Sequence, residues 1–214
     1  MQQSSKAARV RRIGGLVAAA ILMVFGVLSA FQGLDGRSTV GDALAQEKIV
    51  GTPTMTPSAI AEEANKRGVS GLTLPSCAVA GKSISSGADA RCFAEYMRVD
   101  AMMATGGKTY AQMPRFASRD GKGTNVEAEA IKLPSGVGMP NPARNVWITE
   151  TALSTALNTS YMAEQLSLFG IAVGGAFLLI GLAIAGFTLG GSRMPSLAAA
   201  RGARRREPAT VVTR

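Results

Sequence analysis

Two long stretches of the chain carry no ionisable residue, and this feature constrains the fold most. One covers residues 13–31 (19 residues) and the other residues 168–189 (22 residues). At ~1.5 Å per residue, helices of these lengths reach roughly 28 and 33 Å, which matches a bilayer hydrocarbon core of about 30 Å. The alternative to a membrane span is a buried helix of a soluble protein, but such uninterrupted apolar runs are rare in soluble domains. We therefore expect a mainly α-helical membrane protein with two transmembrane helices.

The distribution of charge predicts the orientation of these helices. The net charge is +9, yet residues 13–192 hold thirteen basic and thirteen acidic residues. The excess lies in the two tails, as Lys6, Arg9, Arg11 and Arg12 at one end and Arg193, Arg201, Arg204, Arg205, Arg206 and Arg214 against Glu207 at the other. Positive residues flank membrane helices on the cytoplasmic side. We therefore expect a plasma-membrane protein with cytoplasmic tails at 1–12 and 190–214, spans at 13–31 and 168–189, and an extracytoplasmic domain at 32–167.

Two other readings of the basic N-terminal region are less favoured. Nucleic-acid binding would use basic residues, but here these residues sit where membrane topology and anionic lipid headgroups need them. A cleaved signal peptide would end at the small residues of 43–45. Its apolar run would be longer than usual, and fourteen residues with three charges separate that run from the cleavage site. We expect the first span to be retained.

The extracytoplasmic domain is predicted to be small and mostly helical, with long loops. Thr56 is a suitable N-cap for a helix over 57–66, which Gly68 can end. Apolar residues at helical spacing predict a second helix over 88–105, stopped by two glycines. From about residue 145 the pattern is helical again, so one helix is expected to continue into the second span. Residues 71–87 and 121–142 are rich in Gly, Pro and Ser and are expected to be loops.

The two cysteines, Cys77 and Cys92, lie fifteen residues apart in the segment expected outside the cytoplasm. Oxidising conditions there favour a disulfide, which in the chain-entropy model contributes about 3 kcal/mol for a loop of this size. Free thiols and a redox pair are the alternatives.

No specific enzymatic chemistry is visible. The chain has no histidine, which removes Ser-His-Asp and Cys-His catalysis and the common His-containing zinc and iron sites. The segment 106–109 (GGKT) resembles the end of a phosphate-binding loop, but position 102 is Met and the glycines close a helix instead of opening one. Four methionines near Cys92 could offer soft copper ligands, although gap filling is the ordinary use of methionine: Met97, Met102, Met103 and Met113. We expect no metal, no cofactor and no enzyme.

Small residues recur with the same 4-7-4 spacing in both predicted spans. The two sets are Gly15, Ala19, Gly26 and Ala30, and Gly170, Gly174, Gly181 and Ala185. Small residues let helix backbones approach closely in lipid, where packing drives association. The two helices are therefore predicted to pack on each other or on a partner, although small residues are common enough in membrane helices for a chance match.

Three short motifs carry a family resemblance: QEKI at 46–49, ATGGKTYA at 104–111 and NTSYM at 158–162. With them the chain resembles a group of small actinobacterial two-span membrane proteins without an established function, some of which carry an automatic label of aromatic-ring-opening dioxygenase. The resemblance covers both spans and half of the domain between them. This chain differs by insertions around Cys77 and at 121–142 and by longer tails. It offers no His-containing iron site for such a dioxygenase.

These observations favour a structural or accessory envelope protein that acts through contacts of its extracytoplasmic domain and spans with another membrane protein or with itself. The alternative is an extracytoplasmic ligand-binding or sensing module, in which the helix entering the second span relays the signal.

Overall fold

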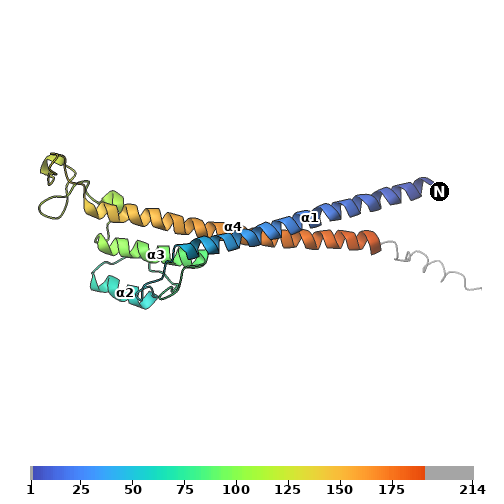
Figure 1. The fold of residues 1–214 in the computed structure, drawn as a ribbon, viewed down its shortest axis with the longest axis horizontal. Helices are drawn as coiled ribbons and strands as arrows, with labels where there is room; N and C mark the ends of the chain where they lie inside the picture. The colour runs from blue at the N-terminus through green and yellow to red at the C-terminus, as the bar shows by residue number, and fades with distance from the viewer. Residues whose placement is uncertain (1, 191–214) are drawn as a thin grey trace, which may run out of the picture. The chain divides into compact units, whose positions relative to one another are not determined.

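The computed structural model describes residues 2–190; the basic residues predicted for the C-terminal tail lie outside them. Four helices dominate: α1 (Gln2–Gln46), α2 (Pro57–Lys66), α3 (Gly87–Ala104) and α4 (Pro142–Gly190), with short 3-10 turns η1 (Tyr110–Gln112) and η2 (Glu127–Glu129) (Figure 1). Within this part of the chain there are isolated β-bridges but no strand. The predicted mainly helical class is confirmed. Both α1 and α4 are long and apolar enough to span a membrane.

The chain divides into two compact units, which are described separately. The first, called the two-helix unit, is made of α1 up to Phe31 and α4 from Gly170 on. The second, called the head unit, comprises Gln32–Phe169 and contains the rest of both long helices together with α2, α3 and the loops.

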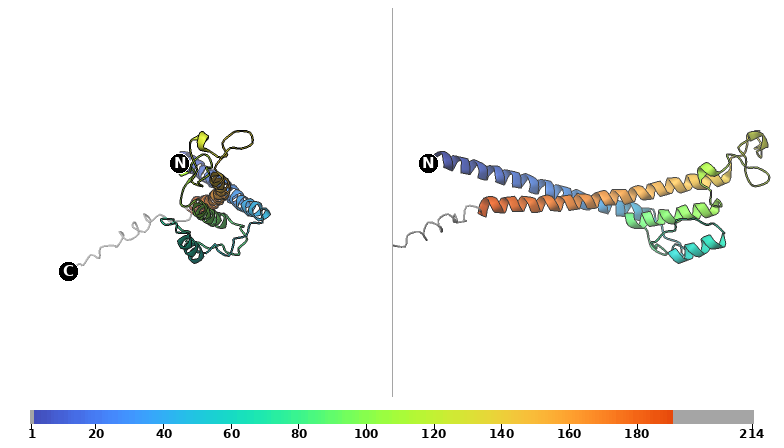
Figure 2. Two further views of the ribbon diagram at one scale, coloured as in Figure 1. Left: turned by 90° about the vertical axis from the view of Figure 1, so that its left-hand side faces the viewer. Right: turned by 180° about the vertical axis from the view of Figure 1, so that it is seen from behind.

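In the head unit, α3 lies between α2 and the first part of α4 (Figures 1 and 2). Because α3 has a neighbour on each of two sides, several of its residues are almost fully buried: Tyr96, Ala90 and Val99. They pack in one core with Leu44 of α1 and Leu157 of α4. Further core members come from α2 and the loops: Met55, Ile60, Ala64, Val79 and Ile84.

The predicted helices of the head unit form for the local reasons expected. The Thr56 side chain accepts a hydrogen bond from the Ala59 N–H at 3.3 Å, and Pro57 is the first residue of α2. At the end of α3, Gly106 and Gly107 take positive φ angles of 61° and 77°. The Gly107 N–H bonds the Met102 carbonyl at 2.8 Å, which satisfies an end carbonyl of the helix. The GGKT segment is thus a helix terminator.

Helix α1 continues fifteen residues beyond the predicted end of the span, to Gln46. Glycine lowers helix propensity, yet this segment contains Gly33, Gly36 and Gly41. The glycines are placed where neighbours come close: a Cβ at Gly36 would lie 2.7 Å from Ser167 Oγ, and one at Gly41 would lie 3.3 Å from the Ser85 carbonyl oxygen. Tertiary packing therefore holds a helix that propensity alone disfavours.

Apart from η2, the segment 114–141 forms no helix or strand, but backbone hydrogen bonds tie it together. Ala117 donates to Met139 at 2.9 Å, Ile131 donates to Ala117 at 2.9 Å, and Met139 donates to Ile131 at 2.7 Å. The predicted loop is therefore an ordered set of short extended pieces.

Candidate functional site

The small residues of the two predicted spans face one another in the two-helix unit. A Cβ at Gly174 would lie 2.6 Å from both the Gly26 carbonyl oxygen and the Ala30 nitrogen, and one at Gly181 would lie 3.0 Å from the Ala19 carbonyl oxygen. Gly15 lies opposite Thr188. Ala19, Gly26, Gly174 and Gly181 are buried, and Gly15, Ala30, Gly170 and Ala185 are half-buried. The helices run antiparallel with backbones in contact.

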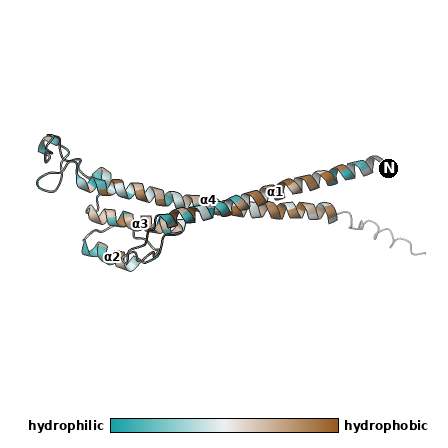
Figure 3. Cartoon of the chain, in the orientation of Figure 1, coloured by the Kyte–Doolittle hydropathy of each residue, from teal (hydrophilic) through white to brown (hydrophobic). Residues whose placement is uncertain are grey.

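Large apolar side chains cover the outward faces of the same helices. In the most apolar 18-residue segment of each helix, only 11% of the residues are buried. Phe25, Phe31, Leu179 and Phe187 are between 59% and 80% exposed. Figure 3 shows these parts of α1 and α4 as the most hydrophobic of the chain. A core helix of a soluble protein would bury such residues, so these faces suit a lipid environment.

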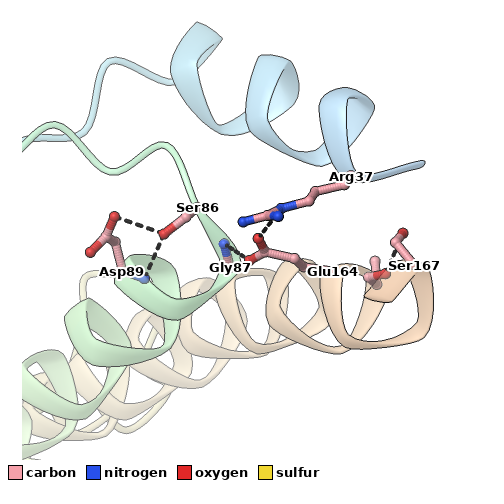
Figure 4. A network of polar contacts seen from close by, with 7 residues as sticks. Arg37, Ser86, Gly87, Asp89, Glu164 and Ser167 are labelled. Atoms are coloured by element: carbon pink, nitrogen blue, oxygen red, sulfur yellow. Dashed lines mark hydrogen bonds and ion pairs between the residues drawn. The ribbon is translucent and has the colours of Figure 1, made fainter. Parts of the chain in front are cut away.

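A buried carboxylate joins three helices in the head unit (Figure 4). Glu164 of α4 has a side chain only 7% exposed. One of its oxygens accepts the Arg37 Nε–H at 3.0 Å, and the other accepts the Gly87 N–H, at the first residue of α3, at 2.6 Å. Gly87 is required here because a Cβ would lie 2.7 Å from the Tyr161 Cα. We call Arg37, Glu164 and Gly87 the three-helix clasp.

Cys77 and Cys92 are joined in a disulfide with an S–S distance of 2.02 Å and a Cα–Cα distance of 6.1 Å. The bridge ties the loop before α3 to the first turns of that helix. The Tyr96 hydroxyl donates to the Cys77 carbonyl at 2.7 Å, one turn further along. The loop is thus anchored to α3 by one covalent bond and one hydrogen bond.

The four methionines considered as copper ligands are divided between two apolar clusters. Met97 and Met103 pack in the large core, whereas Met102 and Met113 pack near Trp147. Among residues 2–190, no three His, Cys, Asp or Glu side chains gather closely enough to hold a metal ion. Met103 and Met113 are buried in these clusters, and Met97 and Met102 are half-buried at their edges.

An apolar groove follows the seam between α3 and α4 in the head unit. Its first part has a volume of about 650 Å³ and is walled by Phe93 and Met97 of α3, Leu153 and Leu157 of α4, and the end of α1. Its second part, about 570 Å³, shares Met97 and Asp100 with the first and continues along α4 to Pro142. The two parts are adjacent along the same pair of helices, and together they are called the α3–α4 groove.

The residues that line the α3–α4 groove are spaced as in a coiled-coil seam. On α3 they include Phe93, Met97, Asp100 and Ala104, at intervals of four, three and four. On α4, one row of lining residues follows intervals of four and three, and three further residues widen the same stripe: Pro142, Val146, Thr149, Leu153, Ala156 and Ser160 form the row, and Asn145, Glu150 and Leu157 lie beside it. Such heptad spacing keeps one stripe of each helix facing the same neighbour. Both helices thus present a seam to the groove.

Carboxylates are the charged groups that line this groove. Glu47, Asp100 and Glu150 contribute to its walls, and none of its lining residues is Lys or Arg. Desolvation by burial, and then the nearby Glu63 charge, raise the pKa of the Asp100 carboxyl, and Arg67 acts in the opposite direction. The residue as a whole is nevertheless exposed. A carboxylate with a raised pKa and no ion pair is a frequent feature of functional sites.

Sequence reasoning missed both the clasp and the groove. A signal for the clasp was present, because Glu164 and Arg37 are opposite charges that lie near the ends of the two apolar runs. The groove had a weaker signal, because its stripe on α4 mixes Pro, Thr, Ala and Ser with apolar residues. Among the apolar residues at helical spacing that predict the helix over 88–105, three line the groove: Phe93, Met97 and Ala104.

Compared with family models, curated proteins and solved structures, the chain matches none of them.

Proposed function

We propose that this chain is a two-span accessory protein of the plasma membrane that acts by binding another protein through its extracytoplasmic domain. The observation that carries the proposal is the α3–α4 groove, a mainly apolar surface along two helices that the rest of residues 2–190 leaves open. Residues 1–12 and 190–214 would be cytoplasmic, and residues 32–167 extracytoplasmic. The resemblance to actinobacterial two-span membrane proteins is consistent with this role, which requires no catalytic chemistry.

The exposed apolar faces of α1 and α4 support the membrane part of the proposal. An outward surface of Phe, Leu, Ile and Val on both helices would be costly in water and is favourable in a hydrocarbon core. The contact between the small residues of the two helices supports their association inside the bilayer.

The head unit also supports retention of the first span. Cleavage after Ala45 would remove Arg37 from the clasp and Leu44 from the core. Leu44 is only 5% exposed, and its loss would open the core beside Leu157. Residues 32–45 are therefore part of the folded head unit, which a cleaved leader would not be.

A sensing module is the second candidate function, and one observation favours it. Helix α4 lines the groove between Pro142 and Ser160 and extends as a single helix to Gly190, through the second apolar run. A ligand in the groove would therefore contact the helix that enters the membrane. A sensor would change its span contact when the groove is filled, whereas an accessory subunit would hold a stable partner.

Site-specific photocrosslinking tests the proposal in the full chain in its native membrane. A photoreactive residue at Leu153, 49% exposed in the groove, should give one discrete adduct with a protein that also co-purifies in mild detergent. The control is Ile148 of α4, 54% exposed and outside the groove, which should give little of that adduct. Equal labelling from both positions, or none from Leu153, would contradict a docking groove.

A further inference from the structure

Helix α1 packs beside α4 in one part of the head unit, and the α3–α4 groove lies further along α4, in line with the end of α1. In the head unit, Gly36 lies against Ser167, Arg37 bonds Glu164, and Leu44 packs in one core with Leu157, so α1 runs antiparallel to this part of α4. Helix α1 ends at Gln46, and the chain turns at Lys48, whose φ is +52°. Beyond that point, no third helix from residues 2–190 lines the groove between α3 and α4.

The open part of the groove has the dimensions of a helix. From Leu153 to Pro142 the α4 seam rises roughly 17 Å, or about three helical turns. A third helix lying there would place its own side chains between Met97 and Ala104 on one side and Val146 and Thr149 on the other. Heptad-spaced seams on two packed helices accept a third helix by the same interlocking of side chains.

The charge of the groove determines which helix fits. Within residues 2–190, the side chains of Asp100 and Glu47 have no hydrogen-bond or ion-pair partner. Glu150 is only 5% exposed, and its carboxylate accepts a bond from the Thr151 hydroxyl at 3.3 Å. Arg67, a cation that acts on the Asp100 carboxyl, is paired with Glu63 at 2.8 Å. An occupant with carboxylates would meet the negative charges of Asp100 and Glu47, whereas one with Lys or Arg would pair with them.

We propose that the α3–α4 groove binds a cationic amphipathic helix of a partner protein, which lies in line with the end of α1 as the third helix beside α3 and α4. This inference rests on the proposed docking function and names the chemistry of the partner. The apolar stripe of the partner helix packs on Met97, Leu153 and Ala104, and flanking Lys or Arg residues reach the exposed carboxylates of Glu47 and Asp100.

Synthetic peptides test the partner class with the full chain in nanodiscs of zwitterionic lipid. The probe is an amphipathic helix of about two heptads with Leu at positions a and d and Lys at the flanking positions. The matched peptide carries Glu in place of each Lys. Binding is read by fluorescence anisotropy, and empty nanodiscs correct for binding to lipid. The Lys peptide should bind at least about tenfold more tightly than the Glu peptide.

Variants then separate charge from fold. The Glu47→Gln/Asp100→Asn double variant should lose about fivefold or more in affinity for the Lys peptide, and Glu47→Lys/Asp100→Lys should prefer the Glu peptide. Glu62→Gln, an exposed carboxylate of α2 outside the groove, should bind as the unaltered protein does. Melting curves confirm that each variant is folded.

The outcomes distinguish this inference from the proposed function. Equal binding of the two peptides, or unchanged binding by the double variant, would overturn the cationic partner while leaving a docking groove. Failure of both peptides together with a discrete Leu153 adduct would overturn the helical partner alone. Failure of both peptides without that adduct would overturn the inference and the proposed function together.

Discussion

The Arg37 Nε–H donates to the Glu164 carboxylate at 3.0 Å and joins α1 to α4 where the second oxygen of Glu164 accepts the first N–H of α3. Arg37 is 56% exposed, whereas the Glu164 side chain is 7% exposed. The two partners therefore contribute unequally to the stability of the head unit. Removal of the buried Glu164 carboxylate leaves the Gly87 N–H without an acceptor, whereas removal of the exposed Arg37 cation leaves no donor unsatisfied.

Truncation of the clasp should show this asymmetry. Glu164→Ala is expected to lower the free energy of unfolding of the head unit by about 2–3 kcal/mol, because the Gly87 N–H loses its acceptor. Arg37→Gln should cost less than about 1 kcal/mol. Hydrogen exchange of the first turn of α3 in the detergent-solubilised chain measures both. Glu62→Gln, which breaks an exposed pair with Lys66, is the control and should be nearly silent. Equal effects of Glu164→Ala and Arg37→Gln would refute the asymmetry.

The contact between the two apolar helices should depend on its glycines. Gly174→Ile places a bulky side chain where a Cβ already lies 2.6 Å from the Gly26 carbonyl oxygen, so the helices must separate. Leu179→Ile, at a residue 70% exposed, should have no effect. Oxidative crosslinking between a cysteine introduced at Val24 and single cysteines along the second apolar run, placed outside the small-residue stripe and in a background without Cys77 and Cys92, reports the separation. Membrane insertion should persist in both variants, and equal crosslinking would show that the small residues are not required.

The disulfide should contribute to stability through the loop that it closes. Cys77→Ser/Cys92→Ser is expected to lower the free energy of unfolding by about 2–4 kcal/mol. Reduced wild-type protein should unfold like the double variant, which provides the control. Peptide mapping without reductant should recover Cys77 linked to Cys92. Recovery of both as free thiols from untreated membranes would contradict the bridge.

Asp100 should destabilise the head unit at neutral pH. Because desolvation raises the pKa of its carboxyl, the folded state binds a proton more tightly than the unfolded chain. The resulting stabilisation is complete below the unfolded pKa of about 3.9 and is lost as the pH rises through the higher folded pKa. Asp100→Asn is therefore expected to melt at a higher temperature than wild type at pH 7, with the difference vanishing below about pH 4.

Asp120→Asn is a control for Asp100 with the opposite sign. The Ser118 hydroxyl, and then the Lys122 N–H, lower the pKa of the Asp120 carboxyl. Its stabilisation is present above the unfolded pKa and is lost as the pH falls through the folded value, so Asp120→Asn should not raise the melting temperature at pH 7. If both variants shift the melting temperature in the same direction, desolvation is not the cause at Asp100.

Reporter fusions test the proposed topology. A reporter active only outside the cytoplasm should work when inserted near Gly121, and reporters active only in the cytoplasm should work at both termini, because the charge excess lies in the tails. An external terminus, or a mature chain that begins at Gln46, would contradict the arrangement.

Local patterns in the sequence were enough to predict the helices. Thr56 caps the start of α2 and two glycines after Thr105 end α3, and both effects involve only residues close in the sequence. The hydropathy of the two apolar runs depends only on their composition. Gly26 and Gly174, which meet in the antiparallel contact, belong to two segments whose small residues have the same spacing. The sequence shows this spacing, but it does not show which segment packs on which.

Only the tertiary structure decided where α1 ends, how Glu164 is satisfied and that a groove remains between α3 and α4. Each depends on residues far apart in the chain: Gly41 against Ser85, Arg37 against Glu164, and Met97 beside Leu153. Helix propensity disfavours the glycine-containing end of α1, and close packing on α4 and the α3 region outweighs it. The sequence determined which segments are helical and apolar because those properties are local, whereas the clasp and the groove arise from contacts that exist only once the helices have packed.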